Sequence, residues 1–290
     1  MSDHGKGTRV EHLMLTALQS RDPDILSAQI VEIQQLSPTV KSFTLKVQQK
    51  DDEERNASSS SYRPGQWLDL FIPSVDMVGG FSMYGPPSRL EKDQILDLAV
   101  KYSEWPPANW LHTSASVGAQ VAVRIGGDFY YEQPDDDHQV LLLAGGVGIN
   151  PLSSILFHIA EKMSKFDLII LNVVKNILMY KIGLNQSNCQ RLHLVYSAKT
   201  EKELLFKDAI EGCAQQQPDM ISCSFLATRE QKNSRITQDF LKDTFIQHNL
   251  IPTAKLVCYL CGPPQMIKDF NNYLLSLGVP KEKIKYELWW

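Results

Sequence analysis

The sequence of 290 residues contains no apolar run long enough to cross a bilayer. It also lacks a dense basic stripe, and its formal net charge of −4 argues against nucleic acid as the main partner. The five cysteines follow no zinc or plant-type iron–sulfur spacing, and the seven histidines show no metal-ligand spacing. These absences predict no metal site and indicate a reducing compartment. What remains, 43% apolar and 21% charged residues, is typical of a soluble globular protein.

The most informative segment is residues 140–151, VLLLAGGVGINP. Its four leading apolar residues predict a buried parallel strand, and three glycines follow within residues 145–148. Pro151 stands where a helix takes its first residue, and Leu152–Met163 is expected to be that helix. Glycines let the backbone approach a ligand closely, and a helix N-terminus attracts a pyrophosphate. The segment therefore predicts a nucleotide-binding turn.

A second strand, turn and helix occur near the end of the chain. Leu256–Leu260 is another apolar run, and it leads into CGPPQM, residues 261–266. Both turns are expected at the carboxyl edge of one sheet, where nucleotides bind in open α/β folds. Cys258 and Cys261 form a C-x-x-C, but Cys258 falls inside the strand and is expected to be packed rather than metal-bound.

Patterning divides the chain into two domains after a terminal segment, residues 1–24, that we expect to be loosely held with a short amphipathic helix at His12–Ser20. Residues 25–135 predict an antiparallel β domain, and residues 136–290 predict a doubly wound parallel α/β sheet. The expected strands are Ile25–Gln34, Val40–Val47, Gln66–Ile72, Ile95–Lys101, Gln120–Ile125, Val140–Ala144, Asp167–Val174, Leu192–Ser197, Ser222–Ala227, Leu256–Leu260 and Ile284–Trp289. The further helices are Lys202–Glu211, Thr237–Gln247 and Pro264–Leu277. Asp51–Ser61 predicts an exposed loop.

A β domain followed by an α/β domain with GGVGINP and CGPPQM resembles the ferredoxin–NADP reductase superfamily. The resemblance covers most of the chain from Ile25. Four further segments agree with it: RPGQW at 63–67, LAVK at 98–101, YSAKTE at 196–201 and RIT at 235–237. The resemblance implies a flavin-binding type of β-barrel, with FAD on the barrel and NAD(P)H on the α/β domain. It also implies that the protein positions these cofactors while they carry the redox chemistry.

The resemblance also implies roles for individual residues, which follow from their positions in the matching segments. Phe81 is expected to stack on the isoalloxazine, with the Ser82 hydroxyl near flavin N5 and Glu287 near the reacting ring. Trp289 or Trp290 is expected to cover the flavin face or, alternatively, to pin the carboxyl terminus. The residues assigned to chemistry are Ser82, Cys261 and Glu287. Those assigned to cofactor binding are Gly145, Gly146, Val147, Gly148, Ile149, Asn150, Phe81, Ser82, Val100, Lys101, Ser197, Lys199, Cys261, Gly262, Pro263, Pro264 and Trp290.

One departure from the family pattern concerns the flavin phosphates. The family signature is Arg-x-Tyr-Ser/Thr, whereas this chain has GGFS at 79–82, so the arginine is absent. A second phosphate element is replaced by WPPANW at 105–110. Lys101 or Arg124 is a candidate for compensation. A lost charge-assisted contact costs about 1.5–3 kcal/mol, so FAD is a less secure expectation than NAD.

The first functional hypothesis is an oxidoreductase that passes a hydride from NAD(P)H to FAD and electrons to a separate acceptor, a small molecule or a redox protein. The alternatives are an NAD-binding sensor or interaction module without tightly bound flavin, and a reductase of free flavin. NAD is expected, and NADP is the alternative because Lys199 tolerates a 2′-phosphate. The resemblance implies mitochondria, but Met1–Arg21 matches a transit peptide poorly, which favours the cytoplasm if the chain is full length.

Overall fold

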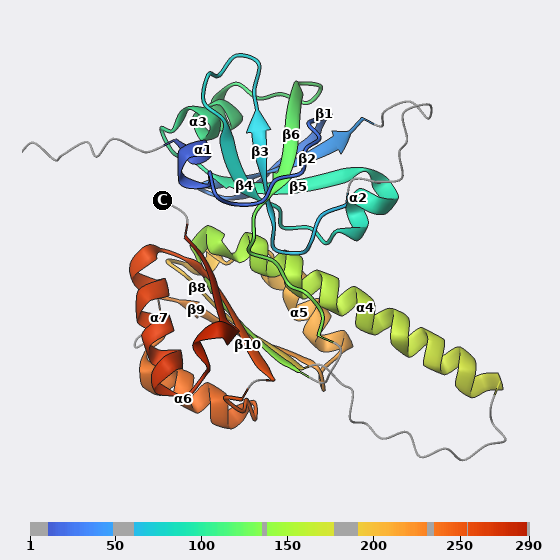
Figure 1. Ribbon diagram of the computed structural model, residues 1–290, viewed down its shortest axis with the longest axis vertical. Helices are drawn as coiled ribbons and strands as arrows, with labels where there is room; N and C mark the ends of the chain where they lie inside the picture. Colours follow the sequence, from blue (N-terminus) through green and yellow to red (C-terminus); the bar gives the residue numbers. More distant parts are fainter. Residues whose placement is uncertain are drawn as a thin grey trace, which may run out of the picture.

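The computed structural model describes residues 11–48, 61–134, 138–176, 191–230, 235–253 and 255–288, and only the backbone along 163–176. The polypeptide forms two stacked halves, a β-barrel above a helix-covered sheet (Figure 1). Most of the loop expected at Asp51–Ser61, and the terminal Trp289 and Trp290, lie outside the described residues.

The first half is an antiparallel sheet in the order β4-β3-β6-β1-β2-β5. A bridge between Met83 and Leu98 joins its two edges and closes it into a barrel. The alternating apolar residues of β2 and β5 fill the interior, among them Phe43, Leu45 and Leu98. The strands are β1 Leu26–Ser37, β2 Val40–Val47, β3 Trp67–Phe71, β4 Gly79–Ser82, β5 Ile95–Lys101 and β6 Gln120–Gly126. The helices are α1 His12–Leu15, α2 Ser88–Asp93 and α3 Pro106–Thr113.

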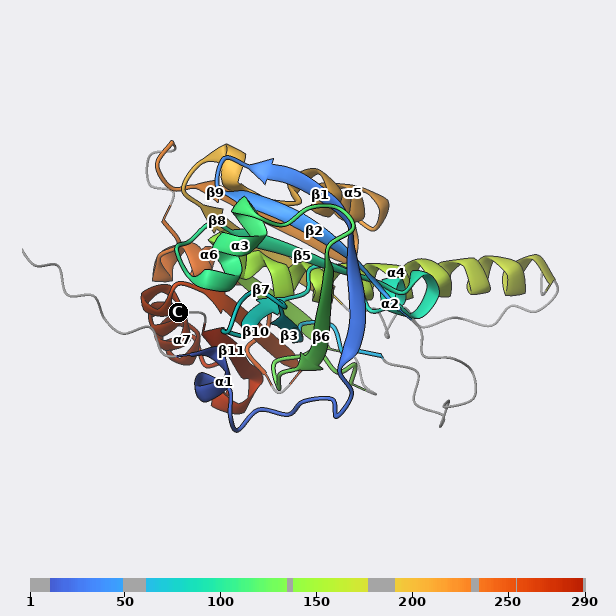
Figure 2. The same ribbon diagram turned by 90° about the horizontal axis from the view of Figure 1, so that it is seen from above.

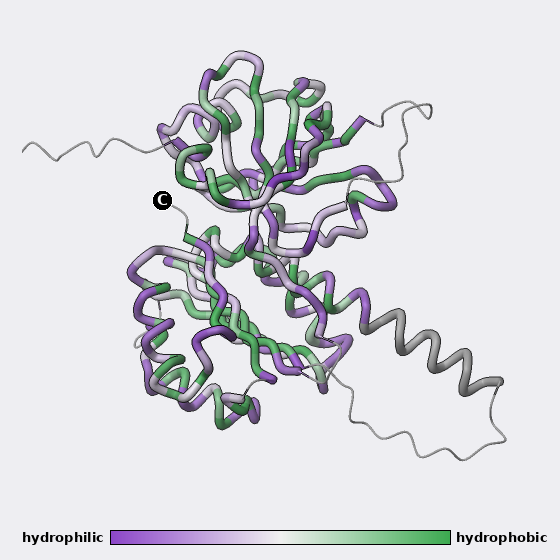
Figure 3. The backbone as a smooth tube through the Cα atoms, in the orientation of Figure 1, coloured by the Kyte–Doolittle hydropathy of each residue, from purple (hydrophilic) through white to green (hydrophobic). Residues whose placement is uncertain are grey.

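The second half is a parallel sheet in the order β11-β10-β7-β8-β9. Its central strands carry continuous apolar runs, visible as green segments in Figure 3, because both faces are covered. Helices α4 and α5 pack on one face, and α6 and α7 pack on the other. The strands are β7 Gln139–Gly145, β8 Arg191–Ala198, β9 Ile221–Ala227, β10 Leu256–Gly262 and β11 Ile284–Leu288. The helices are α4 Ile149–Asn176, α5 Lys207–Gln216, α6 Gln238–Gln247 and α7 Pro264–Ser276, with 3-10 turns η2 Gly146–Gly148, η4 Glu201–Glu203 and η5 Lys281–Lys283.

One expected strand is wrong. Asp167–Val174 belongs to α4, which begins at Ile149 and runs to Asn176, past the edge of the molecule in both views (Figures 1 and 2). A short apolar run without a preceding breaker fits a helix as well as a buried strand, so periodicity alone could not separate them. The helix expected at Lys202–Glu211 is split into η4 and α5.

The two halves share an apolar interface. Phe129 and Tyr131, which follow β6, pack edge-to-face on Tyr259 of β10, with ring centroids 5.7 and 6.2 Å apart. The Tyr131 hydroxyl lies 3.0 Å from His138 Nε2. Val40 and Ala99 of the barrel join the same buried cluster as α4. The barrel therefore holds a fixed face toward the carboxyl edge of the parallel sheet.

Residues 11–24 are anchored, which corrects the expectation of a loosely held terminus. Asp69 is fully buried in β3 and accepts hydrogen bonds from His12 Nε2 and Arg21 Nε, each at 2.9 Å, and from Arg124 at 2.7 Å. Burial by itself raises the pKa of the Asp69 carboxyl, but these hydrogen bonds outweigh burial and hold the pKa below its usual value. The His12 ring also packs edge-on against Trp67 at 4.8 Å between centroids.

Candidate functional site

The two glycine-containing turns meet at one edge of the sheet. Strand β7 pairs with β8 on one side and β10 on the other, so the strand order reverses beside β7. Ala144 lies opposite Cys261 in the β7–β10 register, which places the turns that begin at Gly145 and Gly262 side by side. This arrangement confirms the expected shared edge. It is the topological switch point at which open α/β sheets bind nucleotides.

The first turn requires glycine at Gly146 and at Gly148 for two different reasons. Gly146 has φ +56°, and a Cβ there would meet no atom within 4 Å, so its open side faces free space. At Gly148 a Cβ would lie 2.2 Å from the Cys261 carbonyl oxygen, so the two turns are in backbone contact. Helix α4 begins at Ile149, two residues earlier than Pro151 was expected to start it. Asn150 ties the turn to the barrel, because its side-chain amide donates to the Ala99 carbonyl at 2.7 Å.

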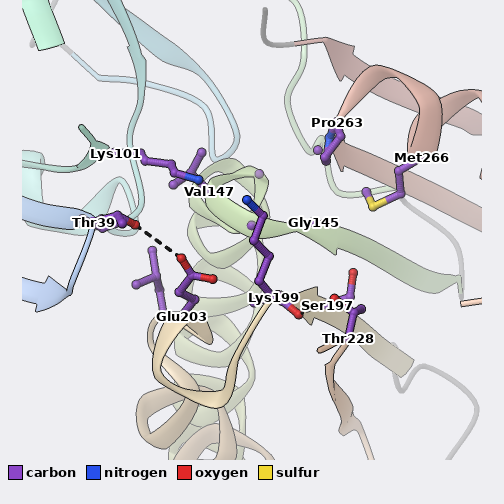
Figure 4. A pocket seen from close by; sticks show the side chains of 16 residues that line it. Thr39, Lys101, Gly145, Val147, Ser197, Lys199, Glu203, Thr228, Pro263 and Met266 are labelled. Atoms are coloured by element: carbon purple, nitrogen blue, oxygen red, sulfur yellow. Dashed lines mark hydrogen bonds between the residues drawn. The ribbon is translucent and has the colours of Figure 1, made fainter. Parts of the chain in front are cut away.

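A cavity of about 370 Å³ opens above this turn, between the two halves (Figure 4). Its walls combine the ends of β7, β8 and β10 with the β1–β2 turn and the end of β5. Of the expected residues, the cavity brings together Lys101, Gly145, Gly146, Val147, Gly148, Ser197, Lys199, Gly262 and Pro263. The lining residues to which the sequence assigned no role are Thr39, Val40, Ala198, Glu203, Leu205, Thr228 and Met266. Thr228 follows β9 as Lys199 follows β8, and the carboxyl-edge rule could have found it.

The cavity is suited to an anion. Lys101 and Lys199 extend from opposite walls toward the N-terminal end of α4 (Figure 4). Neither ammonium group makes an ion pair within the described ranges. The one carboxylate of the lining, Glu203, accepts a 3.5 Å hydrogen bond from Thr39 across the two halves. Two cations and a helix N-terminus together favour a bound pyrophosphate.

Three expected residues meet where β4 and the last two strands of the sheet approach each other. The Ser82 hydroxyl lies 3.5 Å from a carboxylate oxygen of Glu287. Cys261 is opposite Glu287 in the β10–β11 register, and all three side chains are buried. Burial, and then the charge of Glu287, raise the pKa of the Cys261 thiol well above its usual value. A neutral, buried thiol is suited to packing rather than to thiolate chemistry, and the chemical role assigned to Cys261 from the sequence stays a prediction.

The residues expected around an isoalloxazine lie on the strands that meet here. Phe81, half-buried, precedes Ser82 on β4, and Val100 is buried on β5, which the Met83–Leu98 bridge joins to the end of β4. The Oδ1 atom of Asn150 is buried without a hydrogen-bond partner, which leaves an acceptor at the contact between turn and barrel. Trp290, assigned to the flavin face, lies beyond the last described residue. The roles of these side chains stay predictions.

The diphosphate end of FAD does not fit the residues present. Gly79 replaces the arginine, and a Cβ at that position would lie 2.5 Å from the Phe81 ring and 3.0 Å from Pro107. Pro106 and Pro107 occupy the first two positions of α3, so this helix start has lost two N–H donors. Neither candidate for compensation is available to the flavin phosphates. Arg124 is bound to Asp69, and Lys101 lines the nucleotide cavity between the two halves.

Comparison with known proteins agrees with this geometry. Residues 142–272 match the model of the oxidoreductase NAD-binding domain family. Oxidoreductase NAD-binding domain-containing protein 1 of Danio rerio is 39% identical, over 97% of this chain and 98% of its own length. Within the described residues, no helix is both long and apolar enough to span a membrane.

Solved structures share the two-domain fold. The flavohem-like FAD/NAD-binding domain of nitric oxide dioxygenase from Vibrio cholerae has a TM-score of 0.65 and 21% identity, covering 91% of this chain and 98% of that domain. The cytochrome b5 reductase domain of nitrate reductase from Ulva prolifera has a TM-score of 0.66 and 19% identity, covering 91% and 97%.

The family match supports NAD(P) as a cofactor, and the Vibrio cholerae domain is described as binding FAD and NAD. The barrel and the parallel sheet reproduce the two-domain fold of that structure. The glycine turn at the switch point, the positively charged cavity and the matched relatives lead to one assignment. The chain belongs to the family of oxidoreductase NAD-binding domain-containing protein 1.

Proposed function

We propose that this chain oxidises NAD(P)H by passing a hydride to a flavin ring at the junction of its two halves, and that a separate molecule accepts the electrons. The observation that carries the proposal is the cavity at the switch point, whose floor is the Gly145–Gly148 turn and whose walls hold Lys101 and Lys199. A bound flavin supplies a hydride acceptor next to the nicotinamide.

The chain's own groups have distinct tasks in this proposal. The turn at Gly146 binds the nucleotide diphosphate through backbone N–H groups, Lys101 neutralises its charge, and Lys199 stands at the ribose 2′ position. The neutral Cys261 packs against the nicotinamide and excludes water. Ser82 and Glu287 form a buried hydroxyl–carboxylate pair that holds a proton beside the reacting ring.

We propose NAD as the nucleotide that the chain prefers, with NADP as the alternative. Lys199 is the exposed cation that follows β8, where a ribose 2′-substituent is read in dinucleotide-binding sheets. Glu203, on the same wall, opposes a second negative charge. Steady-state rates with NADH and NADPH at equal concentration decide between them.

The nucleotide site is tested by Gly146→Val. A β-branched side chain at φ +56° is strained and projects into the cavity, so the affinity for NADH falls at least about tenfold. NADH fluorescence titration measures this loss. Gly212→Ala is the matched control, because a Cβ at that position of α5 meets no atom within 4 Å. Unchanged NADH affinity in a folded Gly146→Val protein contradicts the assignment.

A further inference from the structure

The surface of the barrel around β4 and α3 lacks the groups that hold a diphosphate. We propose that the flavin is an exchangeable substrate, recognised by its isoalloxazine ring, and that the chain reduces riboflavin, FMN and FAD with similar efficiency. This inference rests on the proposed function, because the hydride comes from NAD(P)H in the cavity at Gly145–Gly148.

Helix α3 begins with two residues that cannot donate a hydrogen bond. A helix N-terminus binds a phosphate through the N–H groups of its first turn. Pro106 and Pro107 fill the first two positions, Trp105 makes no capping hydrogen bond, and the next residue, Ala108, is buried. One N–H donor of the first three positions is left, and it is inside the protein.

The space beside Gly79 is filled by the protein itself. The Phe81 ring and Pro107 would be 2.5 and 3.0 Å from a Cβ at Gly79, so no side chain enters between them. The Phe81 ring also approaches Trp105, with centroids 6.1 Å apart. Aromatic and proline side chains therefore occupy the position at which a cation would meet the flavin phosphates.

The arginines of the described barrel residues are all engaged elsewhere. Arg21 and Arg124 bind Asp69, and Arg89 binds Asp97 at 2.5 Å. Arg63 lies over the Tyr130 ring at 4.3 Å. Among the described residues of the barrel, a flavin tail thus meets neither a guanidinium without a partner nor an open helix terminus. Each missing charge-assisted contact lowers affinity about tenfold or more.

The ring end of the site is kept, which makes reduction of a bound flavin feasible. Ser82 and Glu287 meet at the junction, and the nucleotide cavity begins at Gly262, the residue after Cys261, which pairs with Glu287. The reaction balances without a further reactant. NAD(P)H gives a hydride, which carries two electrons and one proton, to the oxidised flavin, and solvent supplies the second proton. The products are NAD(P)⁺ and fully reduced flavin, which leaves the protein.

The test compares kcat/KM for riboflavin, FMN and FAD with NADH at saturation, without oxygen. We expect the three values to agree within about threefold, because the tail makes no specific contact. A preference for FAD of tenfold or more overturns this inference and leaves the proposed function standing. Failure of all three flavins to oxidise bound NADH contradicts the proposed function, and the inference with it.

A variant separates ring recognition from general damage. Phe81→Ala removes the aromatic platform and should raise KM about tenfold for each of the three flavins, with NADH affinity unchanged. Phe240→Ala, a partly buried ring on α6, is the control and leaves all three KM values unchanged. Equal KM values for Phe81→Ala and the unchanged protein also overturn the inference.

Discussion

The glycines of the nucleotide turn and those of β4 lack side chains for different reasons. At Gly146 and Gly148 the absence of Cβ leaves an open cavity and lets two turns touch backbone to backbone. At Gly79 and Gly80 the freed space is already taken, by Phe81 and Pro107 in one case and by the His12 ring, 2.2 Å from a Cβ, in the other. A glycine pair at a strand therefore indicates close approach, and only the neighbours decide whether a ligand or the protein makes it.

The cations of the nucleotide cavity and those around the buried Asp69 also differ. In the nucleotide cavity Lys101 and Lys199 make no ion pair among the described residues, so they are available to a ligand. In the barrel Arg21 and Arg124 are used to hold the buried Asp69. The arginines around Asp69 stabilise the fold, whereas Lys101 of the barrel and Lys199 of the sheet are available for binding.

The greatest loss of stability is expected when the buried ion cluster around Asp69 in the barrel is broken. Asp69→Asn removes the charge that pairs with Arg21 and Arg124, and we expect a loss of about 3–5 kcal/mol in the free energy of unfolding, because the cations stay partly buried without their partner. Urea denaturation measures it. Asp128→Asn, an exposed acceptor of the Ser20 N–H, is the control and should cost less than about 1 kcal/mol. Equal losses would show that the cluster is not an anchor.

The next largest loss is expected where the two turns of the nucleotide half touch backbone to backbone. In Gly148→Ala the new methyl group meets the Cys261 carbonyl, so the two turns must move apart. We expect the free energy of unfolding to fall by about 1–3 kcal/mol and NADH affinity to fall at least about tenfold. Thermal unfolding and fluorescence titration give the two values. An unaltered NADH affinity would mean that the contact between the turns does not shape the site.

The third effect is a pH dependence of stability that arises in the second half of the molecule, at His193 on β8. Burial, and then the charge of His248, lower the pKa of His193 to about 3, and the two imidazole rings stack at 3.7 Å. Unfolded histidine takes a proton near pH 6.5, so stability is present above that pH and is lost as the pH falls from 6.5 toward 3. We expect about 2 kcal/mol to be lost between pH 6.5 and 5.

The measurement for this pH effect is urea denaturation at several pH values. His193→Gln should flatten the stability profile between pH 8 and 5, whatever its absolute stability. Loss that arises from Asp69 occurs at lower pH, because the pKa of that carboxyl is below its usual value and its contribution persists until the carboxylate is protonated. A profile with the same slope in His193→Gln would contradict the assignment.

The smallest effect concerns the exposed cations. Lys199→Ala should raise KM for NADPH about tenfold and for NADH about twofold, because a 2′-phosphate loses a charge-assisted contact that a hydroxyl never made. The effect on KM for NADPH, relative to that for NADH, should shrink in high salt. Lys202→Ala, on η4 outside the cavity lining, is the matched control. Parallel changes in both KM values would remove Lys199 from the recognition of the 2′ position.

Elements with a regular pattern were predictable, and those made by distant contacts were not. Val40–Val47 and Ile95–Lys101 were expected with the bounds that the structure has, because their alternation reflects one buried face. Strand β4 was missed, since its two glycines resemble a turn. The His12–Asp69 contact joins residues with no relation in spacing.

The same distinction holds for the site. Of the residues expected at the two turns, Gly145–Gly148, Gly262 and Pro263 line the cavity, because close backbone approach has a local signature in the sequence. Thr39 and Glu203 were not found, since each enters the cavity only when the barrel is docked on the sheet. The missing arginine at Gly79 was visible in the sequence, but the filling of its place by Phe81 and Pro107 required the structure.

The most direct test of this account is the visible absorption spectrum of the protein after gel filtration, recorded before and after NADH is added without oxygen. We expect a protein that binds NADH but carries no flavin, and that reduces riboflavin once both are supplied. One FAD per chain that survives gel filtration and is bleached by NADH would contradict it, because the barrel would then hold the dinucleotide tail that its residues leave without partners.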